Sequence, residues 1–266
     1  MKNIFYFFAI IALLASCQKV IDIDLNEANP TPVIEGNYTA EDSTVRVKLS
    51  LTSSYFNSET SNFINDANVN ITDDSGLISN IPSIGNGMYE LQSYIPNFNT
   101  TYTLSVSHDG TTYSAQCDLL DTVSLSEITY EYNPGGFFGS DAGYLVFLNF
   151  DDPINISNYY QVVLSLNGVE LNALNEIFTQ DDIFSDGNTV SRPLFGGDFF
   201  QIEDTVGMEL RSIDQDIYSY LNEAISIFGS NSASSAAPGN PYSNWNNNAL
   251  GYFSAYGNSR KEIIIE

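Results

Sequence analysis

The acidic residues of one long loop are the side chains best suited to hold a metal ion. They are Asp181, Asp182, Asp186 and Asp198. The loop also contains Gly187 and Gly196-Gly197, and carboxylate oxygens on such a flexible backbone are ligands that Ca²⁺ prefers. The spacing departs from an EF-hand, because the third position counted from Asp182 is Phe184. The loop is thus either a Ca²⁺ site or a solvated acidic turn, and the spacing favours the turn.

Catalytic groups are few and poorly grouped. His108 is the only histidine, so a Ser–His–Asp mechanism would depend on it, yet it stands at an expected hairpin tip where imidazoles are usually solvated. Cys117 shares an expected strand face with Tyr113 and Ala115, which indicates a small buried hydrophobic residue. The run Asp151-Asp152-Pro153 is typical of a turn. No phosphate-binding glycine motif is present, and paired acids for glycoside hydrolysis can be recognised only in three dimensions.

Two aromatic side chains offer a binding alternative. Tyr242 and Trp245 stand in a stretch rich in asparagine. Rings next to amide groups suit sugar rings or a protein interface. The competing interpretation is that these rings fold back and cover the core.

The charge balance excludes several classes of partner. The 266 residues include 33 Asp and Glu against 8 Lys and Arg, for a net charge of −25. A surface this acidic repels phosphate backbones and anionic headgroups, which excludes nucleic-acid binding and adhesion to membranes through a basic patch. One His and two Cys are too few for a Cys/His zinc site. Residues 49–191 include 18 Asp and Glu and no Lys or Arg. These acidic side chains are therefore solvated, paired with cations or in contact with a basic partner protein.

The N-terminus has the pattern of a bacterial lipoprotein signal. Lys2 precedes an uncharged apolar run at 4–13, which is too short to span a bilayer. It ends in Leu14-Ala15-Ser16-Cys17, which resembles a lipobox, so we expect residues 1–16 to be removed and Cys17 to carry acyl chains. The alternative is an ordinary secretory signal with a fortuitous Cys. Residues 17–30 then form a lipidated tether.

The remaining chain is mainly β in its patterning. Residues 44–51 alternate apolar and polar side chains, and several short runs up to 120 do the same between turn residues such as Asp109-Gly110. This predicts an antiparallel β-sandwich over 31–120, of an Ig-like or prealbumin-like type.

A second β-rich domain is expected over 121–266. Residues 144–150 and 159–166 are predicted strands, while 133–143 and 179–197 are predicted long loops. One helix is expected near 214–228, with Asp214 as its cap. Residues 249–256 and 262–265 are expected to supply closing strands.

The order of short motifs along the chain resembles a known family. These motifs are KVIDIDL at 19–25, PVIEG at 32–36, VKLSLTSSYF at 47–56, ANV at 67–69, GMY at 87–89, SID at 212–214, YSYL at 218–221, NP at 240–241 and ALGYFSAY at 249–256. Together they resemble the Bacteroidota lipoproteins grouped as domain of unknown function 4249. That resemblance covers essentially the whole mature chain and brings no catalytic motif with it. It implies a setting beside TonB-dependent outer-membrane receptors.

These observations lead to one expectation and two alternatives. We expect a non-enzymatic outer-membrane lipoprotein, held by Cys17 alone, that is the accessory or ligand-capture partner of a TonB-dependent receptor for nutrient or metal uptake. The first alternative is a stand-alone surface module that binds carbohydrate or protein, and the second is an unrecognised hydrolase. Residues 18–20 are not a dense acidic run of the kind associated with surface export, so the periplasmic and cell-surface leaflets both remain open.

Overall fold

The computed structural model describes residues 30–53, 62–136, 142–173, 176–194, 199–229 and 239–266. Cys17 and Asp198 lie outside these ranges. Most of the described chain is in strands, so the expected mainly β class is confirmed. No helix in the described ranges is long and apolar enough to cross a membrane.

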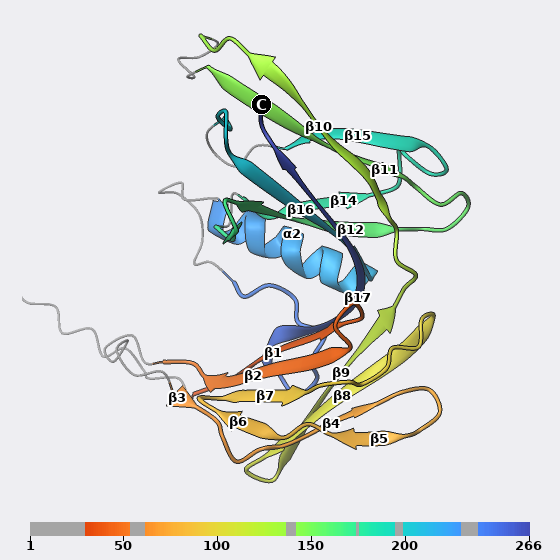
Figure 1. Cartoon of the computed structure of the whole chain (residues 1–266). Helices are drawn as coiled ribbons and strands as arrows, with labels where there is room; N and C mark the ends of the chain where they lie inside the picture. The colour runs from red at the N-terminus through yellow and green to blue at the C-terminus, as the bar shows by residue number, and fades with distance from the viewer. Residues whose placement is uncertain (1–29, 54–61, 137–141, 174–175, 195–198, 230–238) are drawn as a thin grey trace, which may run out of the picture.

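A ten-stranded sheet runs through the whole molecule (Figure 1). Its main path, in spatial order, is β13 (Val169–Leu171), β12 (Tyr159–Leu166), β16 (Thr205–Ile213), β17 (Leu250–Ile264), β1 (Pro32–Thr39), β2 (Thr44–Leu51), β7 (Met88–Leu91) and β6 (Ser83–Gly85). Off this path, β14 (Phe178–Asp181) pairs with β12, and β3 (Asn62–Phe63) pairs with β2. The pairing of β1 with β17 is parallel, which departs from the purely antiparallel arrangement that the sequence predicted.

Two smaller sheets complete two sandwiches. One has the order β5 (Ile78–Asn80), β4 (Asn68–Thr72), β8 (Thr100–His108) and β9 (Thr111–Leu119). The other has the order β10 (Leu125–Asn133), β11 (Gly143–Asp151) and β15 (Thr189–Leu194). Strand β14 overlaps the start of 179–197, and strand β15 lies inside this range. The expectation of one long loop over 179–197 is therefore wrong.

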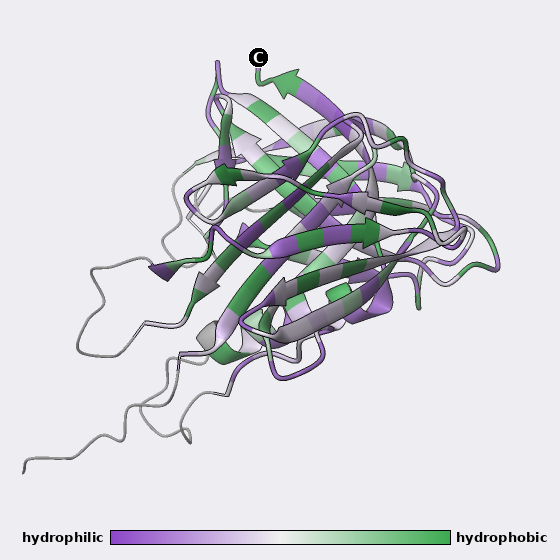
Figure 2. Cartoon of the chain, turned by 90° about the horizontal axis from the view of Figure 1, so that it is seen from below, coloured by the Kyte–Doolittle hydropathy of each residue, from purple (hydrophilic) through white to green (hydrophobic). Residues whose placement is uncertain are grey.

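Each sandwich has its own hydrophobic core, built from alternating side chains. Residues of the first core include Ile34, Tyr38, Val45, Val47, Leu49, Val69, Ile71, Leu104 and Val106. Residues of the second include Val146, Leu148, Phe150, Tyr160, Val162, Leu164, Val206, Met208 and Leu210. Figure 2 shows the corresponding alternation of hydrophobic and hydrophilic residues along the strands. In β2 the buried residues Val45, Val47 and Leu49 are ones that the period of two predicts, while Thr44 is also buried and Leu51 is only half-buried.

Strand β17 belongs to both cores. Phe253 and Ala255 pack in the first core, while Ile263 and the residue just after the strand, Ile265, pack in the second. Alternate residues of a strand share a face, so both small sheets cover the same face of the ten-stranded sheet. The expectation of two separate closing strands is therefore wrong, because the intervening residues pair with β16 without a break. Gly251 is required at the start of β17, since it has φ +92° and a Cβ there would lie 2.2 Å from the Ile34 carbonyl oxygen.

The opposite face of the sheet carries the helix α2 (Gln215–Gly229), close to where the sequence predicted it. Asp214 caps it, because its Oδ1 accepts a hydrogen bond from the Ile217 N–H at 2.9 Å. The ring of Tyr220 lies 5.0 Å from that of Tyr252 in β17. Tyr252 alternates with the core residue Phe253, so α2 covers the face that the two small sheets leave open (Figure 1).

Candidate functional site

Three carboxylates meet where two loops of the second sandwich touch. The loop between β11 and β12 supplies Asp152, and the loop between β14 and β15 supplies Asp182 and Asp186. One oxygen atom from each lies within 4.8 Å of the others. Two of the four predicted acids therefore come together. A third, Asp181, instead accepts a hydrogen bond from the Tyr218 hydroxyl at 3.0 Å, and the placement of Asp198 is not described.

Each of the three carboxylates accepts a backbone N–H from the other loop. The three bonds are Asn155 N to Asp186 Oδ1 (2.7 Å), Asn158 N to Asp182 Oδ2 (2.7 Å) and Gly187 N to Asp152 Oδ2 (3.3 Å). The Tyr160 hydroxyl also donates to Asp152 at 2.5 Å. The acids thus hold the two loops together, which gives the cluster a structural role whether or not it binds an ion.

The donor set of the cluster is compatible with Ca²⁺, which takes oxygen ligands. Besides the three carboxylates, Asn158 Oδ1 and Ser185 Oγ in the same loops are buried without a hydrogen-bond partner among the described residues. Ca²⁺ binding stays a prediction. Burial raises the pKa of Asp152, and the negative charges of Asp182 and Asp186 add to this effect, while the bonds from Tyr160 and Gly187 oppose it.

The face of the ten-stranded sheet on which α2 lies also carries most of the basic side chains of the described chain. Arg46, Lys48, Arg211 and Arg260 all lie on it. Each is paired with an acid, as in Lys48 to Glu35 at 3.3 Å and Arg46 to Glu90 at 2.9 Å.

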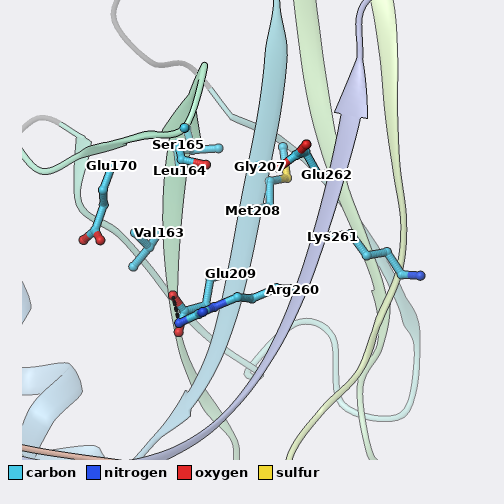
Figure 3. Close-up of a pocket in the computed structure, with 11 residues that line it drawn as sticks. Val163, Leu164, Ser165, Glu170, Gly207, Met208, Glu209, Arg260, Lys261 and Glu262 are labelled. Carbon is cyan, nitrogen blue, oxygen red and sulfur yellow. Dashed lines mark ion pairs between the residues drawn. The ribbon is translucent and has the colours of Figure 1, made fainter. Parts of the chain in front are cut away.

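A hollow of about 460 Å³ is lined by residues that include Glu209 and Arg260, which form an ion pair at 3.3 Å (Figure 3). Burial alone would raise the pKa of Glu209, but Arg211 and Arg260 lower it. The carboxylate of Glu209 is thus paired with the guanidinium groups of Arg211 and Arg260, so this group of residues does not present a net charge of one sign.

Trp245 is a core residue, so the alternative of an exposed binding ring does not hold at this position. Its exposed fraction is 5%, and its indole N–H donates to the Ile34 carbonyl at 3.1 Å. Tyr242 is 59% exposed. Of the two interpretations, the one in which the ring covers the core holds for Trp245, and the two rings do not form one exposed aromatic surface.

The asparagines around Trp245 have a structural role as well. They bond to the free edge of β9 through Asn247 Nδ2 to Thr112 O (2.8 Å), Ser114 N to Asn246 Oδ1 (2.8 Å) and Asn244 Nδ2 to Gln116 O (3.1 Å). An uncovered sheet edge would present unpaired N–H and C=O groups to other chains. The segment that suggested a sugar site therefore closes the edge of a sheet.

The other candidate catalytic residues are also placed in structural roles. His108 is at the end of β8, with its ring nitrogens 3.4 Å from carboxylates of Asp66 and Asp109. Both nitrogens thus face acids, and neither is left to activate a serine hydroxyl. Cys117 is buried as expected, and its Sγ accepts the Ala255 N–H at 3.0 Å. Burial raises the pKa of this thiol well above its ordinary value, which makes it unreactive.

Sequence reasoning missed two features of the loop pair. The run Asp151-Asp152-Pro153 indicates a turn, not a cluster of acids at Asp152, and no sequence motif marks Ile154, Ile156, Ile183 and Phe184 as exposed. A signal was present, because both loops begin with Asp-Asp and continue with large apolar residues where turns usually have polar ones.

The comparison with protein families decides the relationship of this chain. The family described as domain of unknown function (DUF4249) matches residues 18–262. The chain belongs to the DUF4249 family. A comparison with curated proteins finds no significant match.

Among solved structures, the DUF4249 chain is similar to a two-domain fibronectin type III segment of chicken tenascin. Identity is 13% and the TM-score 0.22, over 72% of this chain and 90% of that one. It is also similar to the FN1–FN3 domains of chicken CNTN1, with 7% identity and a TM-score of 0.25, over 71% of this chain and 62% of that one. At these TM-scores neither likeness says more about the DUF4249 chain.

The position of Trp245 can be tested through stability. We expect Trp245→Ala to lower the free energy of unfolding of this DUF4249 protein by about 3–5 kcal/mol, because a buried ring and its hydrogen bond are lost. Tyr242→Ala should change it by no more than about 0.5 kcal/mol, because that ring is mostly in solvent. Urea denaturation of both variants gives the comparison. A Trp245→Ala variant as stable as the wild type would contradict the placement of the ring.

The environment of Asp152 predicts a pH dependence. The pKa of Asp152 is higher in the folded protein than in the unfolded chain. Between these two pKa values the folded protein keeps a proton that the unfolded chain has lost, so the free energy of unfolding falls as pH rises. Asn does not titrate. The free energy of unfolding of Asp152→Asn, relative to that of the wild type, should therefore rise as pH is raised from about 4, the ordinary pKa of an Asp.

A second variant serves as the control for this experiment. Tyr160→Phe removes the hydroxyl that stabilises the charged form of Asp152, so the fall in stability with rising pH should become larger. Parallel pH profiles for the wild type and Asp152→Asn in urea denaturation would show that the titration of Asp152 is not coupled to folding.

Proposed function

We propose that this chain is a non-enzymatic, lipid-anchored outer-membrane protein that acts as the accessory or ligand-capture partner of a TonB-dependent receptor in nutrient or metal uptake. The observation that carries the proposal is the sequence Leu14-Ala15-Ser16-Cys17, which follows an apolar run of signal length. Two or three acyl chains on Cys17 would anchor the protein firmly, since each buried CH₂ contributes about 0.8 kcal/mol.

The position of the first strand supports a partner in the same membrane. Strand β1 begins at Pro32, and residues 18–31 can span at most about 50 Å when fully extended. A folded unit on such a short tether meets membrane proteins far more often than soluble ones, because the tether raises their effective concentration.

The alternatives have less support than this proposal. A stand-alone carbohydrate-binding module would need an exposed ring at Trp245, but this ring lies in the core. A hydrolase of the Ser–His–Asp type rested on His108, whose two ring nitrogens face Asp66 and Asp109. The leaflet of the outer membrane is not part of the proposal.

Membrane fractionation in the natural host tests the proposed function. A tagged wild-type chain should sediment with outer membranes and, after detergent extraction, co-purify with a large β-barrel receptor. Cys17→Ala should move the protein into the soluble fraction because it removes the acylated thiol. Ser16→Ala is the matched control, since it keeps a small residue before the cleavage site and should stay in the membrane.

Two results would count against the proposal separately. If Cys17→Ala remained in the membrane fraction, the anchor would be wrong. If the wild type were extracted as a monomer with no receptor, the accessory role would be wrong even with the anchor in place.

A further inference from the structure

The two loops that carry the acidic cluster also expose four large apolar side chains to solvent. Phe184 is 97% exposed and Ile183 is 71% exposed, and Ile154 and Ile156 are each more than half exposed. Single exposed apolar residues are normal on a protein surface. Here four of them lie on two loops that are hydrogen-bonded to each other, and we call these four residues the apolar patch. Such a local concentration of exposed apolar residues is typical of an interaction site. We refer to residues 151–158 and 181–188 as the loop tip, which projects from one side of the second sandwich (Figure 1).

The loop tip is held in a fixed shape. The three carboxylates of the cluster bond backbone N–H groups across the two loops, and the Asp152 N–H donates to the Asn188 carbonyl at 3.0 Å. Gly187 packs so closely on Ile154 that a Cβ there would lie 2.8 Å from its Cγ1. A patch whose backbone is already ordered loses little entropy when it binds, which favours recognition of a partner.

The charge of the loop tip limits what can cover it. The two loops contain five Asp residues and no Lys or Arg. An anionic lipid surface would be repelled by these acids, as would a second copy of this chain at its own loop tip. A protein pocket with an apolar floor and Lys or Arg at its rim is complementary in both respects.

We propose that the loop tip is the surface through which this chain docks onto its partner, a protein with an apolar pocket bordered by Lys or Arg. The inference deepens the proposed function, on which it rests for the setting of that partner in the membrane. Phe184 and Ile183 enter the pocket, and the exposed acids Asp151 and Asp186 lie against its basic rim. Asp186, which helps to order the two loops, thus also contributes to the choice of partner.

Photo-crosslinking in the natural host tests the docking surface. The chain with Phe184→p-benzoyl-phenylalanine should form a crosslink to one protein, at a peptide that combines apolar residues with flanking Lys or Arg. The matched control has the same crosslinker in place of Ile95, an apolar residue of the first sandwich that is 83% exposed, and it should not capture that protein.

A second pair of variants measures the contribution of the patch. In the chain with the crosslinker at 184, Ile183→Ser should lower the yield of the crosslink by about tenfold or more, because truncation of a central apolar contact has effects of that size. Ile95→Ser should leave the yield within about twofold. Thermal unfolding of both Ser variants should match the wild type, because both side chains are in solvent.

The outcomes separate this inference from the proposed function. Capture from 184 of a protein that is not an outer-membrane receptor, at a peptide of the stated composition, would support the docking surface and contradict the receptor. Crosslinks from 184 only to lipid, no crosslink from 184, or equal capture from 95 would overturn the docking surface, whatever protein co-purifies with the chain.

Discussion

The pairing of β17 with β1 on one side and with β16 on the other is the constraint on which the rest of the structure depends. Through it, two hydrophobic cores share one sheet and lie on the same face of it. The period of two makes this arrangement strict, since a slip of one residue would move Phe253 and Ile263 out of their cores together. The helix and the paired charges are left to the opposite face. The frame that carries the loop tip is therefore set by a single strand.

The loop tip combines two features that are each unfavourable alone. Three carboxylates close together repel one another, and four large apolar side chains lie in water. The backbone N–H groups that the acids accept offset part of the first cost and order the loops. The exposure of the four apolar side chains to water stays unfavourable until another surface covers them. A fold that keeps both features in one place is consistent with selection for binding rather than for stability.

The sequence predicted the elements whose signals are local. Strands at 44–51 and 159–166 match β2 and β12 because their alternation is clear and their turns have residues that accept positive φ, such as Asn167-Gly168. The helix was found through its cap at Asp214. Elements that depend on distant partners were missed. Residues of β15, which include Pro193, form a strand only because β11 offers them an edge. Asp152 meets Asp182 across thirty positions of sequence, and no local pattern reports that contact.

The central claim is that β17 unites the two sandwiches into one cooperative unit, which holds the loop tip in place. Native-state hydrogen exchange tests it most directly, because it reports the opening free energy of each strand. The slowest amides of β2, β12 and β17 should exchange with one common free energy, equal to that of global unfolding, and lose protection together as denaturant is added. Exchange of the β12 amides at a distinctly lower free energy than those of β2 would contradict it, because the second sandwich would then open without the first.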